Sequence, residues 1–370
     1  MKLTLKIKLL PTEEQSKLLL ETITEANKLC NTISQVAWET KTFNVHKLHH
    51  LVYYRFKEIY NLSSQILIRC IAKVVDSYKL DRKVKREFRP LGSIGYDNRI
   101  LTYKSNDIVS IWTIGGRSKI PFICHNPNYL PYIKGEADLV YKKGKFYLFQ
   151  TVDIPEDEVE NIEEFIGVDF GLTDLVVTSD GIKHTGEWLN DYREKRQRIR
   201  SSVQSKGTRS SKRLLKRLSG REKTTATIQN HTISKSIVKR AKEQKKGISI
   251  EDLTNIRFTS KRRNKKFKTK LNRWNFGQLR SFLTYKCLLY GVPLVVVNPA
   301  FTSQTCSKCK HIGNRKNKSF ECKNCGHNED ADINASKNIA TLGRAINHVG
   351  ESNMHCSFVM RNLGSKPIGL

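Results

Sequence analysis

The chain has 370 residues, 38% of them hydrophobic and 9% aromatic, which is enough for two or three domains with buried cores and excludes a disordered chain. Its 66 lysines and arginines against 35 aspartates and glutamates give a formal net charge of +31. A nucleic acid is the commonest partner that offsets such an excess. No run of about 18 apolar residues or secretory signal is present. We therefore expect a cytoplasmic, nucleoid-associated protein with no membrane partner.

The amino-terminal part is predicted to contain strands interrupted by helices. Residues 3–11 alternate at period two, as a strand does, and the helical pattern that follows runs to about Leu80 with Thr12 as its N-cap. From about Gly92 to Pro155 the period returns to two, with a glycine-containing hairpin. This order predicts a small β-barrel interrupted by a helical domain.

The pattern of strands and helices in the second half of the sequence predicts an α/β domain. Two apolar strands lie within 163–181, and a long basic helical region follows them. A short buried strand at 247–253 precedes the basic segment 257–270. A helix, another buried strand, a cysteine-rich module and a final helix from about Asn334 complete the pattern, and we expect the last residues to form a loosely attached tail.

Four of the nine cysteines form two CxxC pairs, Cys306–Cys309 and Cys322–Cys325. Each pair can place two thiolates on one tight turn, and two such turns complete a tetrahedron around zinc. Four unlinked buried thiols are the simpler alternative. The pairs, together with an odd total of cysteines, indicate a reducing compartment and a structural zinc site with no position open for substrate.

Three carboxylates end or begin apolar segments. Asp169 follows "FIGV", where a lone aspartate ordinarily starts a turn, and Glu251 ends "ISIE". Asp332 begins "DINASKNI", where a helix N-cap is the ordinary explanation. Together the three fit an RNase H-like sheet, in which such carboxylates converge on two Mg²⁺ ions that cut a phosphodiester bond.

Two basic runs, residues 193–223 and 257–270, are nearly unopposed by acids. A solvated charged face is the usual explanation of a short run, but the length of both favours phosphate binding. Tyr53, Tyr54 and Phe56 lie next to Arg55 and offer base stacking, although aromatic residues at helical spacing are more often part of a core.

The sequence resembles the TnpB family, the transposon-encoded OrfB proteins related to type V CRISPR effectors. The resemblance rests on "GVDFGLTDLVVTSDG", "ISIEDLTNIR", "WNFGQLRSFLTYKCLLYGVPLVVVNPAFTSQTCSKC" and "FECKNCGHNEDADINASKNI", and more weakly on the opening "LKIKLLPTEEQSKLLLETITEANKLCN". It is specific over about 160–345. It implies an α/β multidomain protein in which a RuvC-like nuclease with an inserted zinc ribbon follows a wedge β-barrel that carries a helical recognition insert.

The resemblance also implies domain boundaries. The expected parts are the first barrel strand (1–10), the helical recognition insert (11–91), the rest of the barrel (92–160), the RuvC-like nuclease (161–302), the zinc ribbon (303–328), the end of the nuclease (329–350) and the tail (351–370).

The activity implied is that of an RNA-guided DNA endonuclease of prokaryotic or viral origin, with a guide RNA from the transposon end and double-stranded DNA as its target. Asp169, Glu251 and Asp332 carry over as its catalytic, magnesium-binding residues, and the four cysteines as zinc ligands. The family often has "DRD" where this chain has "DAD", which leaves Asp330 as an alternative third acid. A guided repressor or RNA-binding protein without cleavage, and a transposase performing strand transfer, remain as alternative functions.

Overall fold

The computed structural model describes residues 1–105, 107–159, 162–254, 276–349 and 368–369, and divides into two compact units. The first comprises Met1–Ile154 with Ser365–Leu370, and the second comprises Pro155–Gly364. The predicted basic segment 257–270 and most of the predicted tail lie outside the described residues. Among the described helices, none is long and apolar enough to cross a bilayer.

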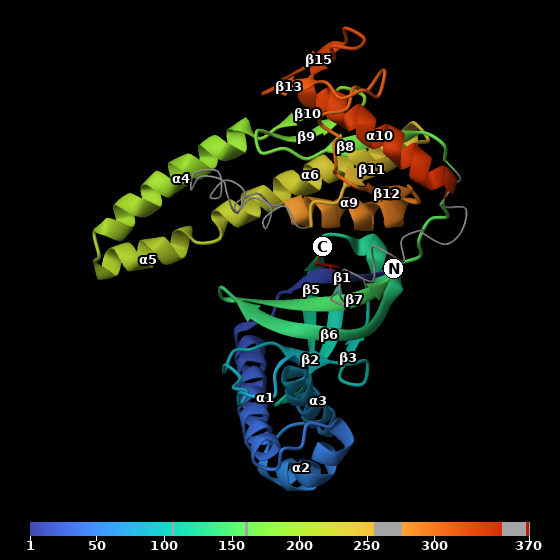
Figure 1. The fold of residues 1–370 in the computed structure, drawn as a ribbon. Helices are drawn as coiled ribbons and strands as arrows, with labels where there is room; N and C mark the ends of the chain where they lie inside the picture. Colours follow the sequence, from blue (N-terminus) through green and yellow to red (C-terminus); the bar gives the residue numbers. More distant parts are fainter. Residues whose placement is uncertain (106, 160–161, 255–275, 350–367, 370) are drawn as a thin grey trace. The chain divides into compact units, whose positions relative to one another are not determined.

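The first unit is built on a sheet that curves into a nearly closed barrel (Figure 1). The strand order is β2–β6–β7–β1–β5–β4–β3, and β16 pairs with β1 in parallel. The strands are β1 (Lys2–Leu9), β2 (Ile94–Tyr96), β3 (Leu101–Tyr103), β4 (Ile108–Thr113), β5 (Gly116–Cys124), β6 (Ile133–Lys142), β7 (Lys145–Asp153) and β16 (Ile368–Gly369), with a 3₁₀ helix, η1 (Pro127–Tyr132), between β5 and β6.

Strand β1 shows why these residues form a barrel. Leu3, Leu5, Ile7 and Leu9 are buried, while the lysines between them face outward, so the period-two pattern places one face of the strand in the core. The strand and the hairpin predicted from the sequence are therefore observed, the latter as β6 and β7.

Three helices are inserted between β1 and β2: α1 (Glu13–Glu39), α2 (Val45–Ile59) and α3 (Ser64–Leu80). The hydroxyl of Thr12 accepts a hydrogen bond from the backbone N–H of Gln15, and the Gln15 side chain accepts one from the backbone N–H of Thr12. This capping box starts α1 at the predicted residue.

The second unit is built on a mixed sheet with the order β10–β9–β8–β11–β12 (Figure 1). Strands β8, β11 and β12 are parallel, and β9 and β10 run antiparallel to their neighbours. The strands are β8 (Phe165–Asp169), β9 (Asp174–Thr178), β10 (Lys183–Thr185), β11 (Gly247–Glu251) and β12 (Leu294–Val297). The helices are α4 (Glu187–Ser205), α5 (Arg209–Leu218), α6 (Arg221–Glu243), α9 (Phe276–Tyr290) and α10 (Ala331–Val349).

The two faces of this sheet pack against different helices. Ile166 and Val168 of β8 and Ile250 of β11 share a buried cluster with α6 and α9, to which Ile237 and Leu283 belong. The alternate residues face α10, because the hydroxyl of Ser249 donates to the carbonyl of Ile339 at 3.0 Å. Helix α10 therefore covers the face opposite to α6 and α9.

The approach of α10 to β8 requires glycine at position 167. A Cβ atom added there would lie 1.9 Å from the carbonyl oxygen of Ser336 and 2.5 Å from the backbone nitrogen of Ala340. Gly343 makes the corresponding approach from the helix, since a Cβ there would lie 2.5 Å from that of Ser249. The absence of side chains at these contacts lets the helix backbone rest directly on the strands.

We expect Gly167→Ala to lower the free energy of unfolding of the second unit by more than about 2 kcal/mol, because backbone atoms on both sides must move. The measurement is urea unfolding followed by circular dichroism. Gly277→Ala, in α9, is the matched control, since a Cβ there meets no heavy atom within 4 Å and the change should be within about 1 kcal/mol of wild type. Equal effects of the two substitutions would contradict this account of the packing.

Candidate functional site

The first two predicted acids lie at the same edge of the sheet. Asp169 is the last residue of β8 and Glu251 is the last residue of β11. These strands are parallel neighbours in a register that pairs Val168 with Ile250, so the two acids follow the same rung of the ladder. The carboxyl ends of neighbouring parallel strands therefore bring together two side chains that are far apart in the sequence.

The third acid comes from the start of α10. The carboxylate of Asp330 accepts hydrogen bonds from the backbone N–H groups of Asp332 at 3.0 Å and Ile333 at 3.2 Å, so Asp330 is the N-cap of the helix. Its other oxygen pairs with Lys183 at 2.5 Å. The helix cap is therefore Asp330 and not Asp332. The side chain of Asp332 is free of that role and faces the ends of the strands.

Asp169 lies within electrostatic reach of the other two carboxylates. Burial raises the pKa of Asp169 to about 7, and the neighbouring charges of Glu251 and Asp332 add to the shift. Burial also raises the pKa of Glu251, opposed by a hydrogen bond from the hydroxyl of Thr302 at 2.5 Å and by the charge of Arg315. Burial is therefore the main reason why both carboxyl groups have raised pKa values, and the neighbouring acids add to the effect at Asp169.

Two cations of the cysteine module (residues 303–330) contact the third acid. The Arg315 guanidinium lies 2.8 Å from one oxygen of Asp332, and the Lys318 ammonium lies 2.9 Å from the other. Lys318 also pairs with Asp174, at the start of β9. Arg315 acts on Asp169 and Glu251 as well, because its positive charge partly opposes the rise in the pKa of both. The sequence analysis missed both residues, which lie in a basic connector with no feature that singles them out.

The acids are close but do not form a tight ligand cluster. In the described part of the chain, the one group of three or more His, Cys, Asp or Glu ligand atoms within 4.8 Å of one another is formed by the four cysteines. Asp332 is instead oriented by Arg315 and Lys318, and Glu251 by Thr302. The arrangement brings the three predicted acids to one end of the sheet with a cation among them.

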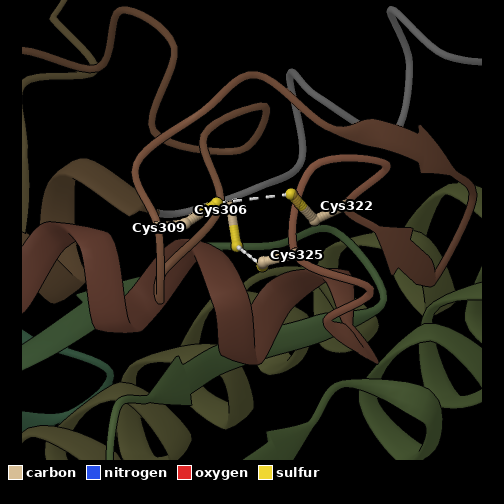
Figure 2. Close-up of side chains that lie close together, drawn as sticks. All are labelled: Cys306, Cys309, Cys322 and Cys325. Carbon is tan, nitrogen blue, oxygen red and sulfur yellow. Dashed lines mark hydrogen bonds between the residues drawn. The ribbon is translucent and has the colours of Figure 1, made fainter.

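The four cysteines come together in the module that precedes α10 (Figure 2). The Sγ atoms of Cys306 and Cys325 are 3.7 Å apart, and those of Cys309 and Cys322 are 3.5 Å apart. A tetrahedron of sulfurs about 2.3 Å from a zinc ion has edges of about 3.8 Å, so the spacing fits that ion. The backbone N–H of His311 is the main cause that lowers the pKa of Cys309, to about 5. The backbone N–H of His327 acts in the same direction on Cys325, but hydrogen bonds with the other thiols outweigh it and raise the pKa of Cys325.

The two CxxC turns have the same backbone construction. In the first, the N–H of Lys310 donates to the carbonyl of Cys306; in the second, the N–H of Gly326 donates to that of Cys322. Lys310 and Gly326 have φ values of 62° and 68°, so each turn closes with a left-handed residue. A small antiparallel sheet of β13 (Asn314–Lys316), β14 (Ser319–Glu321) and β15 (Asn328–Asp330) joins the turns and leads into α10.

The remaining predicted features have mixed outcomes. The basic run 193–223 lies on α4, α5 and the start of α6, whereas the run 257–270 lies outside the described residues. Of the aromatic residues in α2, Phe56 is buried in the core and Tyr54 is 74% exposed.

The chain is similar to known proteins in sequence and in fold. Residues 276–339 match the family model described as the Cas12f1-like TNB domain. A TnpB-like protein of Methanocaldococcus jannaschii is 34% identical over 150 residues, which cover 40% of this chain and 54% of the relative. The CRISPR-associated endodeoxyribonuclease Cas12f1 of Sulfoacidibacillus thermotolerans is 31% identical over 222 residues, which cover 54% of this chain and 50% of the relative.

Among solved structures, the protein of a Cas12f1–sgRNA–target DNA complex superimposes with a TM-score of 0.63 over 89% of this chain and 83% of that chain, at 16% identity. The fold is therefore that of a Cas12f-like protein with mixed α/β content. The chain spans about half the length of the curated relatives it matches. The resemblance to the TnpB family found in the sequence is confirmed by these matches.

The raised pKa of Asp169 predicts an unusual dependence of stability on pH. Because the folded-state pKa of about 7 exceeds the unfolded value of about 3.9, the folded protein loses stability as the pH rises between these values. In magnesium-free buffer at pH 8, Asp169→Asn should raise the free energy of unfolding by about 1–3 kcal/mol, and the gain should shrink towards pH 5. Thermal unfolding at a series of pH values measures this.

Asp252→Asn is the matched control for that measurement. Burial raises the pKa of Asp252, but hydrogen bonds from Thr254 and Arg280 outweigh it and lower the pKa overall. Its substitution should therefore reduce stability at pH 8. Shifts of the same sign for both variants would contradict the assignment.

Proposed function

We propose that the protein is an RNA-guided DNA endonuclease encoded by a transposable element, which cuts guide-matched DNA by two-metal hydrolysis in a RuvC-like site. The observation that carries the proposal is the convergence of Asp169, Glu251 and Asp332 at the carboxyl edge of β8 and β11. The Cas12f1 relative is named as an endodeoxyribonuclease, which supports the class of reaction.

The residues of the site fit magnesium. Carboxylate oxygens are the ligands that this ion prefers. Burial is the main cause of the raised pKa of Asp169, and a divalent cation would relieve the smaller contribution that comes from the charges of Glu251 and Asp332. Two bound magnesium ions would activate the attacking water and offset the charge on the leaving 3′ oxygen. Asp169, Glu251 and Asp332 would hold them, with Thr302 fixing the orientation of the Glu251 carboxylate.

Arg315 and Lys318 complete the site from the cysteine module. Both pair with Asp332, and both can exchange that contact for a phosphate oxygen once a metal ion binds the carboxylate. Both residues lie on the β13–β14 hairpin. The positive charge at the acid site therefore depends on the folding of the cysteine module. The four cysteines would hold a structural zinc ion that keeps this hairpin folded.

The partners proposed are a guide RNA from the transposon end and target double-stranded DNA. The basic helices α4 and α5 support this, since Lys and Arg residues are dense on both and can contact phosphates. Base pairing would select the sequence, while the protein holds the shape of the duplex.

The decisive measurement is cleavage by protein purified with the RNA that copurifies from cells carrying its genomic flanks. Asp169→Asn and Asp332→Asn should retain the RNA and bind a matched duplex but lose magnesium-dependent cutting by at least about 10³-fold, because each removes a metal ligand. Asp330→Asn should still cut, because an asparagine preserves the helix cap.

The outcomes of that measurement separate the alternatives. Binding of a matched duplex without nicking by the wild type would favour a guided repressor. Joining of transposon ends without a guide would favour a transposase. Loss of cutting in Asp330→Asn with retention in Asp332→Asn would reverse the assignment of the third acid.

Metal analysis of the purified protein should find about one zinc ion per chain, and Cys322→Ser should lose it. Proteolysis should then become faster within residues 303–330, because the module has little core besides the cysteines, Phe320 and Ala331. Cys124→Ser, at the end of β5 and outside the module, should keep the zinc. Full zinc content in Cys322→Ser would argue against the four-sulfur site.

A further inference from the structure

Helix α4 carries a strip of aromatic and cationic side chains at steps of four residues. Each side chain of this strip lies about one helical turn beyond the last, so the strip winds slowly around the helix. Its members are Trp188, Tyr192, Arg196, Arg200 and Gln204. The rings of Trp188 and Tyr192 stack with centroids 5.8 Å apart, and the guanidinium of Arg196 lies 5.9 Å from the centre of the Tyr192 ring. Trp188 is 60% exposed, which leaves much of its ring open to solvent.

The strip leads into a cavity of about 310 Å³ between α4 and α5, which lie side by side in Figure 1. An Arg196 N–H donates to the carbonyl of Leu218 at 3.4 Å and ties the two helices together. The wall from α4 is polar and the wall from α5 is partly apolar. The main lining residues are Arg196, Arg200, Gln204, Leu215, Lys216 and Leu218.

The cavity favours an anion that also has an apolar part. Arg196, Arg200 and Lys216 supply positive charge, and the one acidic lining residue, Glu222, pairs with Arg193 at 3.4 Å. Leu215 and Leu218 provide an apolar surface beside these charges. A phosphate with an attached base matches both properties, and the volume lies at the lower end of the range for small-ligand sites, roughly 300–1,000 Å³.

The other end of the strip is anchored beside the candidate catalytic acids. The backbone N–H of Gly186, which precedes α4, donates to the carbonyl of Thr173 at 2.8 Å, and the side chain of Asn190 donates to that of Leu172 at 3.3 Å. Leu172 and Thr173 belong to the turn that directly follows Asp169. The first turn of α4, with Trp188, is thus attached to the loop that leaves the acid site.

We propose that this strip is a binding track for single-stranded nucleic acid, which runs from the acid site along α4 and holds one unpaired nucleotide in the α4–α5 cavity. A base stacks on the exposed face of Trp188, the arginines and Lys216 contact phosphates, and the base of the held nucleotide lies against Leu215 and Leu218. In the proposed nuclease, the track would lead a strand to or from the site of cutting. This role of the strand rests on the proposed function.

The features favour an unpaired strand over a duplex. A duplex offers phosphates to basic residues but keeps its bases stacked inside, so an exposed tryptophan and an apolar-walled cavity would add nothing to its binding. A single strand uses both, because its bases are free to stack on aromatic rings.

The test is fluorescence anisotropy of the full chain without magnesium, with a labelled 12-nucleotide single-stranded DNA, an RNA of the same sequence and a blunt duplex as probes. Trp188→Ala should weaken single-strand binding about tenfold and duplex binding less than twofold. Arg200→Gln/Lys216→Gln should weaken single-strand binding and reduce the slope of log affinity against log salt by about 1.4, the value for two phosphate contacts.

The matched control is Arg198→Gln/Arg213→Gln, which removes the same charge from exposed positions on α4 and α5 that do not line the cavity. This double variant should weaken single-strand binding less than threefold. It should change the salt slope by less than half of the change expected for Arg200→Gln/Lys216→Gln. Equal losses in the two double variants, or no loss in Trp188→Ala, would overturn the track and leave only a general basic surface. A stronger effect on RNA than on DNA, or the reverse, identifies which strand the track holds.

This experiment is independent of the proposed cleavage. Single-strand binding is measured without magnesium and requires no cleavage, so it is observed whether or not the protein cuts. A track that binds as described in a protein that never cuts would refute the nuclease and retain the track, whereas a cutting enzyme without the tryptophan effect would do the opposite.

Discussion

The direct contact between the backbone of α10 and the strands β8 and β11 is the constraint on which the candidate site depends. Gly167 and Gly343 remove the side chains that would separate these layers, and Ser249 fixes the register by its hydrogen bond to Ile339. Because the helix cannot slide without breaking this contact, its first turn is held over the carboxyl ends of the strands. Asp332 is thereby brought near Asp169 and Glu251.

The same constraint explains why the site is electrostatically unusual. Burial raises the pKa of Asp169, and the two neighbouring carboxylates add to the shift. Arg315 and Lys318, which reach in from the cysteine module, offset part of this negative charge. The module is thus more than a separate metal knuckle beside the domain. Its hairpin is part of the acid site, which explains why a strongly basic chain places acids directly after its cysteines.

The α4 strip extends this pattern away from the sheet. Its first residues are tied to the turn after Asp169, and its later residues open into the cavity against α5. Aromatic and cationic side chains are therefore arranged in sequence along one path on α4. We infer from this order that the path binds a strand, because a general attraction to phosphate would need no aromatic side chains.

The sequence by itself determined the features that depend on neighbouring residues: the alternation in β1, the capping box at Thr12, the two CxxC turns and the apolar strands that end at Asp169 and Glu251. These follow from local periodicity and spacing, which one stretch of chain contains. Only the tertiary structure decided that Asp330 caps α10 while Asp332 faces the strands. The two aspartates are two residues apart, and only the position at which the helix begins decides which of them caps it. Likewise, Arg315 and Lys318 look like ordinary members of a basic connector, and they acquire a role only where folding places them against acids more distant in the chain. Long-range electrostatics and the close packing of helix on sheet select these partners, and neither leaves a local pattern in the sequence.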